Sequence, residues 1–236
     1  MQFDSQGLSA FYDSSTGQVT RRLIQRRVKT AWPDLRGTRV LGFGFAVPYL
    51  RTFGLEAERV VAALPDALGP LCWPANRSLC ALSEEDALPF PDSLFDRILL
   101  IHGLETADVT RPLMRQIWRV LAPAGRLLVV VPNRTSLWAQ VDRSPFAHGR
   151  PFSRGQLDRL LRDTMFVPER WDTALLLPPI RSRRLVRSGT AWERTGQMLW
   201  PRLAGVHVVD ATKSLYAIAP VKKVRKLKPV LAPARA

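Results

Sequence analysis

Two short, mostly apolar runs constrain the fold of this chain more than any other feature of its sequence. They are FDRILLI at residues 95–101 and GRLLVVVP at residues 125–132. Apolar runs of this length are typical of strands buried on both faces in a parallel sheet. Between them lies a predicted crossover helix with four apolar residues on one face: Leu113, Ile117, Val120 and Leu121. This order of strand, helix and strand predicts right-handed parallel crossovers, and hence a doubly wound α/β sheet.

Other segments extend this sheet toward both ends of the chain. We expect five further strands: TRVLGF (38–43), ERVVAAL (58–64), RSLCAL (77–82), WDTALLL (171–177) and GVHVVDATKSLYAIA (205–219). A helix over residues 17–32 is expected to end before Pro33, because the residue before a proline disfavours helical geometry. Another helix begins after Ser153, which forms a capping box with Gln156. The segment 181–199 also has helical character.

The length of 236 residues suits one sizeable α/β domain. We expect an N-terminal helical cap or lid at residues 1–35, the main domain at 36–220, and a basic, disordered tail at 221–236. The composition, 46% hydrophobic and 23% charged, is that of a folded protein. The N-terminus lacks the residue order of a secretory signal and no apolar run is long enough to cross a membrane, which favours a cytoplasmic location.

The two cysteines, Cys72 and Cys80, are too few for a disulfide framework. We expect them to be buried free thiols. No cysteine and histidine cluster has the spacing of a zinc site, so the sequence predicts no metal.

Positive charge is concentrated in three runs of a chain whose formal net charge is +15. Residues 21–29 and 181–187 contain no acid, and residues 222–236 carry six basic residues and no acid. Such a field attracts RNA, anionic headgroups or acidic partners through counterion release. The other interpretation is a solubilising surface, because no aromatic pattern typical of nucleic-acid binding accompanies the charge.

Three segments follow predicted strands, at the edge where open α/β sheets bind ligands: GFGFAVP (42–48), ALSEEDALPFPD (81–92) and IHGLE (101–105). The succession EEDALPFPDSLFDRILLIHGLE and then IWRVLAPAGRLLVVVPN resembles the class I S-adenosylmethionine-dependent methyltransferases, in particular the small-molecule enzymes similar to those of ubiquinone biosynthesis. The resemblance covers residues 38–131 and, more loosely, 11–220. It implies a Rossmann-like methyltransferase fold: a seven-stranded, mostly parallel sheet with helices on both faces and an antiparallel last strand.

The resemblance also implies S-adenosyl-L-methionine as the cofactor and particular residues as its ligands. Gly42 and Gly44 match the loop under its methionine and ribose parts, where a missing side chain permits close approach. Glu84 matches the acid that accepts a hydrogen bond from the adenine amino group, and Glu85 lies beside it. His102 matches the loop that faces the methyl donor and acceptor. The alternative interpretation is structural: the two glutamates are a solvated acidic turn, and His102 is a strand-end histidine bonded to backbone.

The glycine loop departs from the family pattern. Gly42 stands where the family has an acid, and Ala46 and Pro48 stand where it has glycine, although Pro48 suits a first helical turn. The second strand ends at residues 63–65 without the acid that holds the ribose hydroxyls. A charge-assisted hydrogen bond of this kind is worth roughly 1.5 to 3 kcal/mol. Compensation would come from backbone donors or from three aromatic faces: Phe43, Phe45 and Trp73.

Methyl transfer requires little chemistry from the protein, because the sulfonium is already activated and positioning supplies much of the acceleration. The candidate groups on the acceptor side are Tyr12 in the N-terminal segment, His102 and His148. Arg150, close to His148, is a candidate anion clamp. In the alternative interpretation, their loop is structural and packs on Trp138.

We therefore predict a methyltransferase that acts on a small-molecule acceptor. IHGL at residues 101–104 is not the Asn/Asp-Pro-Pro-aromatic motif of base N-methylases. The alternative is a catalytically weak or inactive methyltransferase-like protein that binds RNA, a ribosomal particle or an acidic protein partner through its basic surface. A nicotinamide-dependent enzyme is disfavoured, because the full G-x-G-x-x-G motif is missing.

Overall fold

The structure of the chain is a computed structural model that describes residues 3–74, 78–141, 144–176 and 203–215. The expected helical segment at 181–199 lies outside the described residues. So do the basic run at 181–187 and the tail at 221–236.

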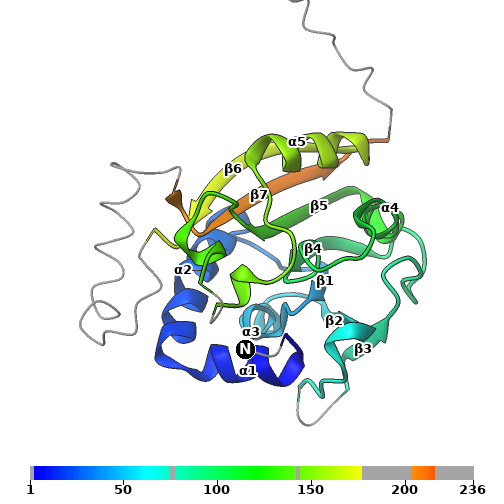
Figure 1. Cartoon of the computed structure of the whole chain (residues 1–236). Helices are drawn as coiled ribbons and strands as arrows, with labels where there is room; N and C mark the ends of the chain where they lie inside the picture. Colours follow the sequence, from blue (N-terminus) through cyan, green and yellow to red (C-terminus); the bar gives the residue numbers. More distant parts are fainter. Residues whose placement is uncertain (1–2, 75–77, 142–143, 177–202, 216–236) are drawn as a thin grey trace, which may run out of the picture.

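The described chain forms a seven-stranded sheet in the order β3-β2-β1-β4-β5-β7-β6 (Figure 1). Its strands are β1 (Arg39–Gly44), β2 (Arg59–Pro65), β3 (Cys80–Ser83), β4 (Phe95–Ile101), β5 (Leu121–Pro132), β6 (Phe166–Ala174) and β7 (Val206–Lys213). The first five strands pair in parallel, and β7 is antiparallel to both β5 and β6. This confirms the doubly wound, mostly parallel sheet with an antiparallel last strand.

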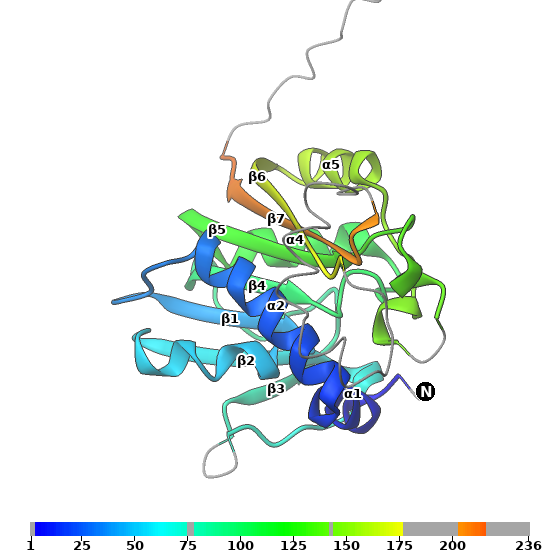
Figure 2. The same ribbon diagram turned by 90° about the vertical axis from the view of Figure 1, so that its left-hand side faces the viewer.

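Helices cover both faces of this sheet. They are α1 (Ser5–Asp13), α2 (Ser15–Ala31), α3 (Val47–Leu50), α4 (Thr110–Val120) and α5 (Arg154–Asp163). Figure 2 shows α2 in front of the sheet, with α4 behind it. Successive residues of a strand point to opposite faces, so Leu99 packs with α1, α2 and α3 while its neighbour Leu100 packs with α4 and α5. Two apolar layers therefore enclose β4, as its largely apolar sequence predicts.

The helix ends follow the local signals in the sequence. The Ser153 hydroxyl accepts from the amide of Gln156, and the Gln156 side chain accepts from the amide of Ser153, which confirms the capping box of α5. Helix α2 ends at Ala31, ahead of Pro33. Pro48 lies in the first turn of α3, where its missing amide hydrogen leaves no hydrogen bond unmade.

Strand β6 begins at Phe166, five residues before the expected start at Trp171. Pro168 hides the first half of this strand in the sequence, since proline has no amide hydrogen to donate to a sheet. The strand tolerates Pro168 because β6 lies at the edge of the sheet, and its pairing with β7 shifts register between Pro168 and Arg170.

Both cysteines are free thiols, but only one of them is even partly buried. Cys72 is exposed in the loop after β2, which corrects the expectation that both thiols are buried. Cys80 is half-buried in β3, and this burial raises the pKa of its thiol to about 11. Among the residues that the structure describes, no helix is both long and apolar enough to span a membrane.

Candidate functional site

The carboxyl ends of β1 and β4 lie in contact, and Gly44 makes this contact feasible. Gly44 has a φ of +79°, and a Cβ atom on it would lie 2.3 Å from the carbonyl oxygen of Ile101. At Gly42, a Cβ atom would lie 2.6 Å from a methyl group of Leu50 in α3. Both glycines therefore serve close packing within the chain itself, at the strand ends where the sequence predicted a cofactor loop.

The two phenylalanines of this turn lie in opposite cores. Phe43 is fully buried on the side of α4 and α5, whereas Phe45 is buried on the side of α1. The Phe45 ring stacks on Tyr12, with ring centroids 5.9 Å apart and an interplanar angle of 14°. Both rings are almost fully buried, with 0% of Phe43 and 1% of Phe45 exposed.

Tyr12, His102 and Glu105 form a buried chain of hydrogen bonds. The Tyr12 hydroxyl lies 2.7 Å from Nε2 of His102, and Nδ1 of His102 lies 3.2 Å from Oε1 of Glu105. The side chains of His102 and Glu105 are 0% and 1% exposed. His102 has a φ of +54°, an unusual backbone conformation that turns its side chain inward at the end of β4.

A second tyrosine, Tyr49, extends this series of hydrogen bonds and favours one direction for it. The Tyr49 hydroxyl donates to the Tyr12 hydroxyl at 2.9 Å, which leaves the Tyr12 proton for Nε2 of His102. Burial raises the pKa of Tyr12 and of Tyr49, so both hydroxyls keep their protons at neutral pH. The Nδ1–H tautomer of His102 matches this arrangement, with Nε2 accepting from Tyr12 and Nδ1 donating to Glu105.

Aromatic side chains close the remaining sides of His102. The Phe146 ring centroid lies 4.9 Å from that of His102, and Phe3 contacts His102 edge-on. Phe3 also stacks on His148 at 5.2 Å, so His148 is separated from His102 by one ring. Phe146 in turn packs on Trp138, as the structural interpretation of this loop predicts. Of the three catalytic candidates, Tyr12 and His102 are thus in direct contact and His148 is not.

An acidic cavity of about 300 Å³ opens at the carboxyl ends of β2 and β3. Glu84 lines it with an exposed side chain. Glu85 also lines it, and its Oε2 accepts from the amide of Asp108 at 3.0 Å. Partial burial raises the pKa of the Glu85 carboxyl.

Asp66 is a residue of this cavity that the sequence interpretation missed. The expected position of a ribose acid, the end of β2, holds Leu64, which is fully buried. Asp66 follows two residues later at the start of a short 3₁₀ helix, and it lines the cavity with Glu84. The sequence does place an acid near the end of β2, in the tripeptide Leu64-Pro65-Asp66. Only the turn after Pro65 brings its carboxylate to the strand ends.

Residues 42–129 match the family model described as a methyltransferase domain. Over these residues the chain is similar to the class I S-adenosylmethionine-dependent methyltransferases. The chain is 30% identical over 93 residues to the ubiquinone/menaquinone biosynthesis C-methyltransferase UbiE of Pasteurella multocida, covering 36% of this chain and 35% of that protein. The chain is also 26% identical over 126 residues to the demethylmenaquinone methyltransferase of Thermus thermophilus, covering 52% of this chain and 56% of that protein. The chain thus spans about a third to just over half the length of these curated relatives.

Solved structures share the fold of the methyltransferase domain at low sequence identity. The [4+2]-cyclase SpnF has a TM-score of 0.59 at 19% identity and covers 86% of this chain and 84% of its own. The Burkholderia thailandensis 1,6-didemethyltoxoflavin-N1-methyltransferase, solved with S-adenosylhomocysteine, has a TM-score of 0.55 at 17% identity and covers 89% and 86%. Because one of these proteins is a cyclase, the fold alone does not define the reaction.

In the described conformation, the acidic cavity suits the nucleoside half of S-adenosyl-L-methionine. Asp66 and Glu84 present carboxylate acceptors to an open cavity, and the hydroxyl and amino groups of adenosine are donors. Tyr12 and Phe45 fill the space over the glycine turn. A separate cavity of about 340 Å³ beside them is lined by Tyr12, Phe45, Pro48 and Trp73, among others. Within the described residues, no cluster of histidine, cysteine and acidic side chains is arranged to hold a metal ion.

Proposed function

We propose that this chain binds S-adenosyl-L-methionine at the carboxyl ends of β1 to β4 and transfers its methyl group to a small-molecule acceptor. The observation that carries the proposal is the methyltransferase match over residues 42–129, in which Asp66 and Glu84 are among the five acidic residues that line a cavity at the expected strand ends. Asp66 and Glu84 are the proposed acceptors for the ribose hydroxyls and the adenine amino group. S-adenosyl-L-methionine supplies an activated methyl group when it is bound.

His102 is the proposed general base for an acceptor that must lose a proton. In the Nδ1–H tautomer, Nε2 is free to take a proton and Glu105 orients the ring by accepting the Nδ1 proton. Glu105 is thus a positioning residue, since it acts through His102.

Helix α1 is the proposed lid of this site. Tyr12 occupies Nε2 of His102 in the described conformation, so His102 is available to an acceptor only after Tyr12 withdraws. Residues 1–35, which contain α1 and α2, are accordingly proposed as the cap of the domain at 36–220. Movement of such a lid is a common way to admit ligands and then exclude water.

Calorimetric titration of the purified chain with S-adenosylmethionine and S-adenosylhomocysteine tests the proposal. We expect Asp66→Asn and Glu84→Gln each to weaken binding by about tenfold, the effect of losing a hydrogen bond to a charged group. Glu56→Gln is the matched control, because Glu56 is exposed and does not line the acidic cavity. Absence of binding at millimolar ligand, by heat and by thermal shift, would refute the proposal.

The alternative is a weakly active or inactive methyltransferase-like protein that binds RNA, a ribosomal particle or an acidic partner. One described feature favours it: Arg22, Arg26 and Lys29 are exposed at helical spacing on α2. A salt-dependent affinity for a generic RNA that falls in an Arg22→Gln, Lys29→Gln double variant would support it. Equal binding by this variant and the wild type would argue against it.

A further inference from the structure

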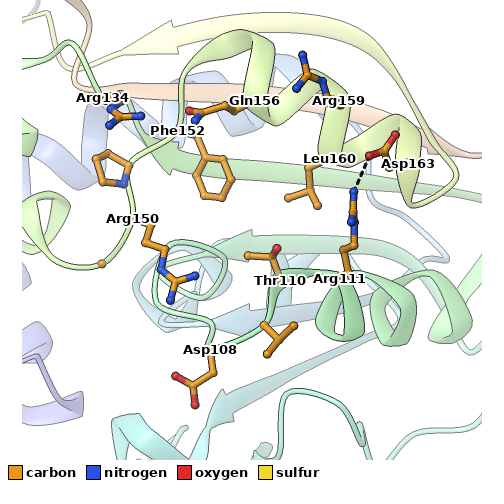
Figure 3. Close-up of a pocket in the computed structure, with 13 residues that line it drawn as sticks. Asp108, Thr110, Arg111, Arg134, Arg150, Phe152, Gln156, Arg159, Leu160 and Asp163 are labelled. Carbon is orange, nitrogen blue, oxygen red and sulfur yellow. Dashed lines mark hydrogen bonds and ion pairs between the residues drawn. The ribbon is translucent and has the colours of Figure 1, made fainter.

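An open cavity of about 740 Å³ lies between the start of α4 and one face of α5 (Figure 3). The loop 149–152 forms its third wall. The methyl-donor residues proposed above do not line it. Asp108 and Val109 line both this cavity and the acidic cavity, so the two cavities lie on either side of these two residues.

Arginine side chains dominate the lining of this cavity. Four line it: Arg111, Arg134, Arg150 and Arg159. Arg111 is paired with Asp163 at 2.8 Å. Within the part of the chain that the structure describes, the guanidinium groups of the other three have no ion pair or hydrogen bond to an acid. Asp108 and Asp163 are the acids of the lining, so the cavity carries an excess of positive charge.

The start of α4 adds the amides of Thr110 and Arg111 as hydrogen-bond donors to the same cavity, whereas Pro112 has no amide hydrogen. Its N-cap residue is Val109, which has no capping side chain, and the first turn contains no acid. The N-terminal amides of a helix have no partner within the helix and carry a partial positive charge. By contrast, the side chains of Asp4, Ser14 and Ser153 cap α1, α2 and α5. In Figure 3 the Arg150 side chain extends from its loop toward the start of α4.

The cavity also has an apolar wall. Phe152 lies between Arg134 and Arg150 in Figure 3, and Leu160 lies beside it on α5. Val109 at the rim is 60% exposed. An oxyanion without an apolar body would leave this wall exposed to water, whereas an aromatic ring or short chain would cover it.

The loop that carries Arg150 is held against the loop of His102. The amide of Arg150 donates to the carbonyl oxygen of Glu105 at 2.7 Å. Gly149 has a φ of +78°, and a Cβ atom on it would lie 2.2 Å from the same oxygen. This contact leaves no room for a side chain at residue 149, so the position of Arg150 is set by the backbone and not by a flexible loop.

We infer that this cavity binds a small organic phosphate, with its phosphoryl oxygens between Arg150 and the start of α4 and its apolar body against Phe152. A planar guanidinium binds two phosphate oxygens at once, and the helix amides add donors for the third. A dianionic phosphate matches the excess of arginines better than a carboxylate with one charge does. The inference goes beyond the proposed function, because it depends on this cavity alone and not on methyl transfer.

Titration of the full chain with phenyl phosphate, benzoate and phenol, without S-adenosylmethionine, tests the inference. We expect phenyl phosphate to bind more tightly than benzoate, and phenol not to bind. Arg150→Gln and Arg134→Gln should each weaken phenyl phosphate binding, by about five- to tenfold for Arg150. Asp108→Asn should tighten it, because it removes a negative charge from the lining.

Arg115→Gln is the matched control, since it removes an exposed arginine of α4 that does not line the cavity. A thermal unfolding transition shows that a variant is folded. If Arg150→Gln is not folded, Arg134→Gln serves as the test of phenyl phosphate binding. Equal weakening by Arg115→Gln, equal binding of phenol and phenyl phosphate, or no binding of phenyl phosphate at millimolar concentration would each overturn the inference. None of these results bears on binding of the methyl donor.

Discussion

The hydroxyl of Tyr12 lies 2.7 Å from Nε2 of His102, although 90 positions separate the two residues in the chain. Helix α1 supplies Tyr12, and the turn after β4 supplies His102. This hydrogen bond joins the N-terminal helix to the carboxyl end of β4, the central strand, near which the methyl donor is proposed to bind. It holds α1 against the end of β4 and at the same time occupies the proposed base.

Tyr12→Phe is expected to destabilise the protein by about 1 to 3 kcal/mol. The variant leaves two buried groups, the Tyr49 hydroxyl and Nε2 of His102, without their partner. Tyr49→Phe is the control, because it keeps the bond between Tyr12 and His102 and should cost about 1 kcal/mol. Urea unfolding measures both values. Equal costs for the two variants would contradict the two hydrogen bonds assigned to the Tyr12 hydroxyl.

His102 is expected to be the Nδ1–H tautomer in the wild type. Tyr12 donates to Nε2, and Glu105 accepts from Nδ1, so neither contact suits a proton on Nε2. Nitrogen NMR of the imidazole distinguishes the two tautomers. We expect Tyr12→Phe to increase the share of the Nε2–H form, because that nitrogen then has no donor facing it. A wild-type ring with its proton on Nε2 would show that the chain of hydrogen bonds runs the other way.

Gly44→Ala is expected to cost about 2 kcal/mol or more in stability. Alanine is strained at a φ of +79°, and its Cβ atom would collide with the backbone of Ile101 and Gly103. Gly54→Ala is the matched control, because a Cβ atom on Gly54 would point into open space and the φ of this residue is ordinary. Chemical denaturation of both variants makes the comparison. A tolerated Gly44→Ala would mean that β1 and β4 do not end in contact.

His207 should make the protein less stable in mild acid. Burial lowers the pKa of its imidazole from 6.5 to about 4, and its Nε2 has no hydrogen-bond partner among the described residues. His207 therefore takes up a proton near pH 6.5 in the unfolded chain but only near pH 4 in the folded chain. Stability falls as the pH drops through this window and the loss levels off below it.

The contribution of His207 amounts to about 2 kcal/mol between pH 7 and pH 5. Urea unfolding at the two pH values measures it, and His207→Gln removes it while other titrating groups remain. If the wild type and His207→Gln lose the same stability between pH 7 and pH 5, His207 is not buried as described.

The parts of the fold that were predictable depend on local signals. Strand β4 is a short apolar run, and the apolar residues of helix α4 recur with the period of a helix. The capping box of α5 needs only Ser153 and Gln156. The first half of β6 was missed, because Pro168 argues against a strand unless the strand is known to lie at an edge. Edge position is a property of the whole sheet and not of the segment.

The candidate site divides in the same way. The family resemblance implies roles for Gly44, Glu84 and His102 in segments that follow predicted strands, and the structure puts all three at strand ends. Glu105 and Asp66 were missed, because their roles depend on which residues lie opposite them. No residue spacing in the sequence predicts that Glu105 contacts Nδ1 of His102, or that Asp66 and Glu84 line the same cavity.

The sequence by itself determined the doubly wound sheet, the two apolar layers and the helix ends, since each depends on residues that are neighbours in the chain or recur with a fixed period. Only the tertiary structure decided that the turn VLGFGF packs against the chain's own backbone, that Tyr12 covers His102, and that unpaired arginines meet beside Phe152. These contacts join distant segments. They arise because the parallel sheet brings the ends of β1 and β4 together and α1 folds across them.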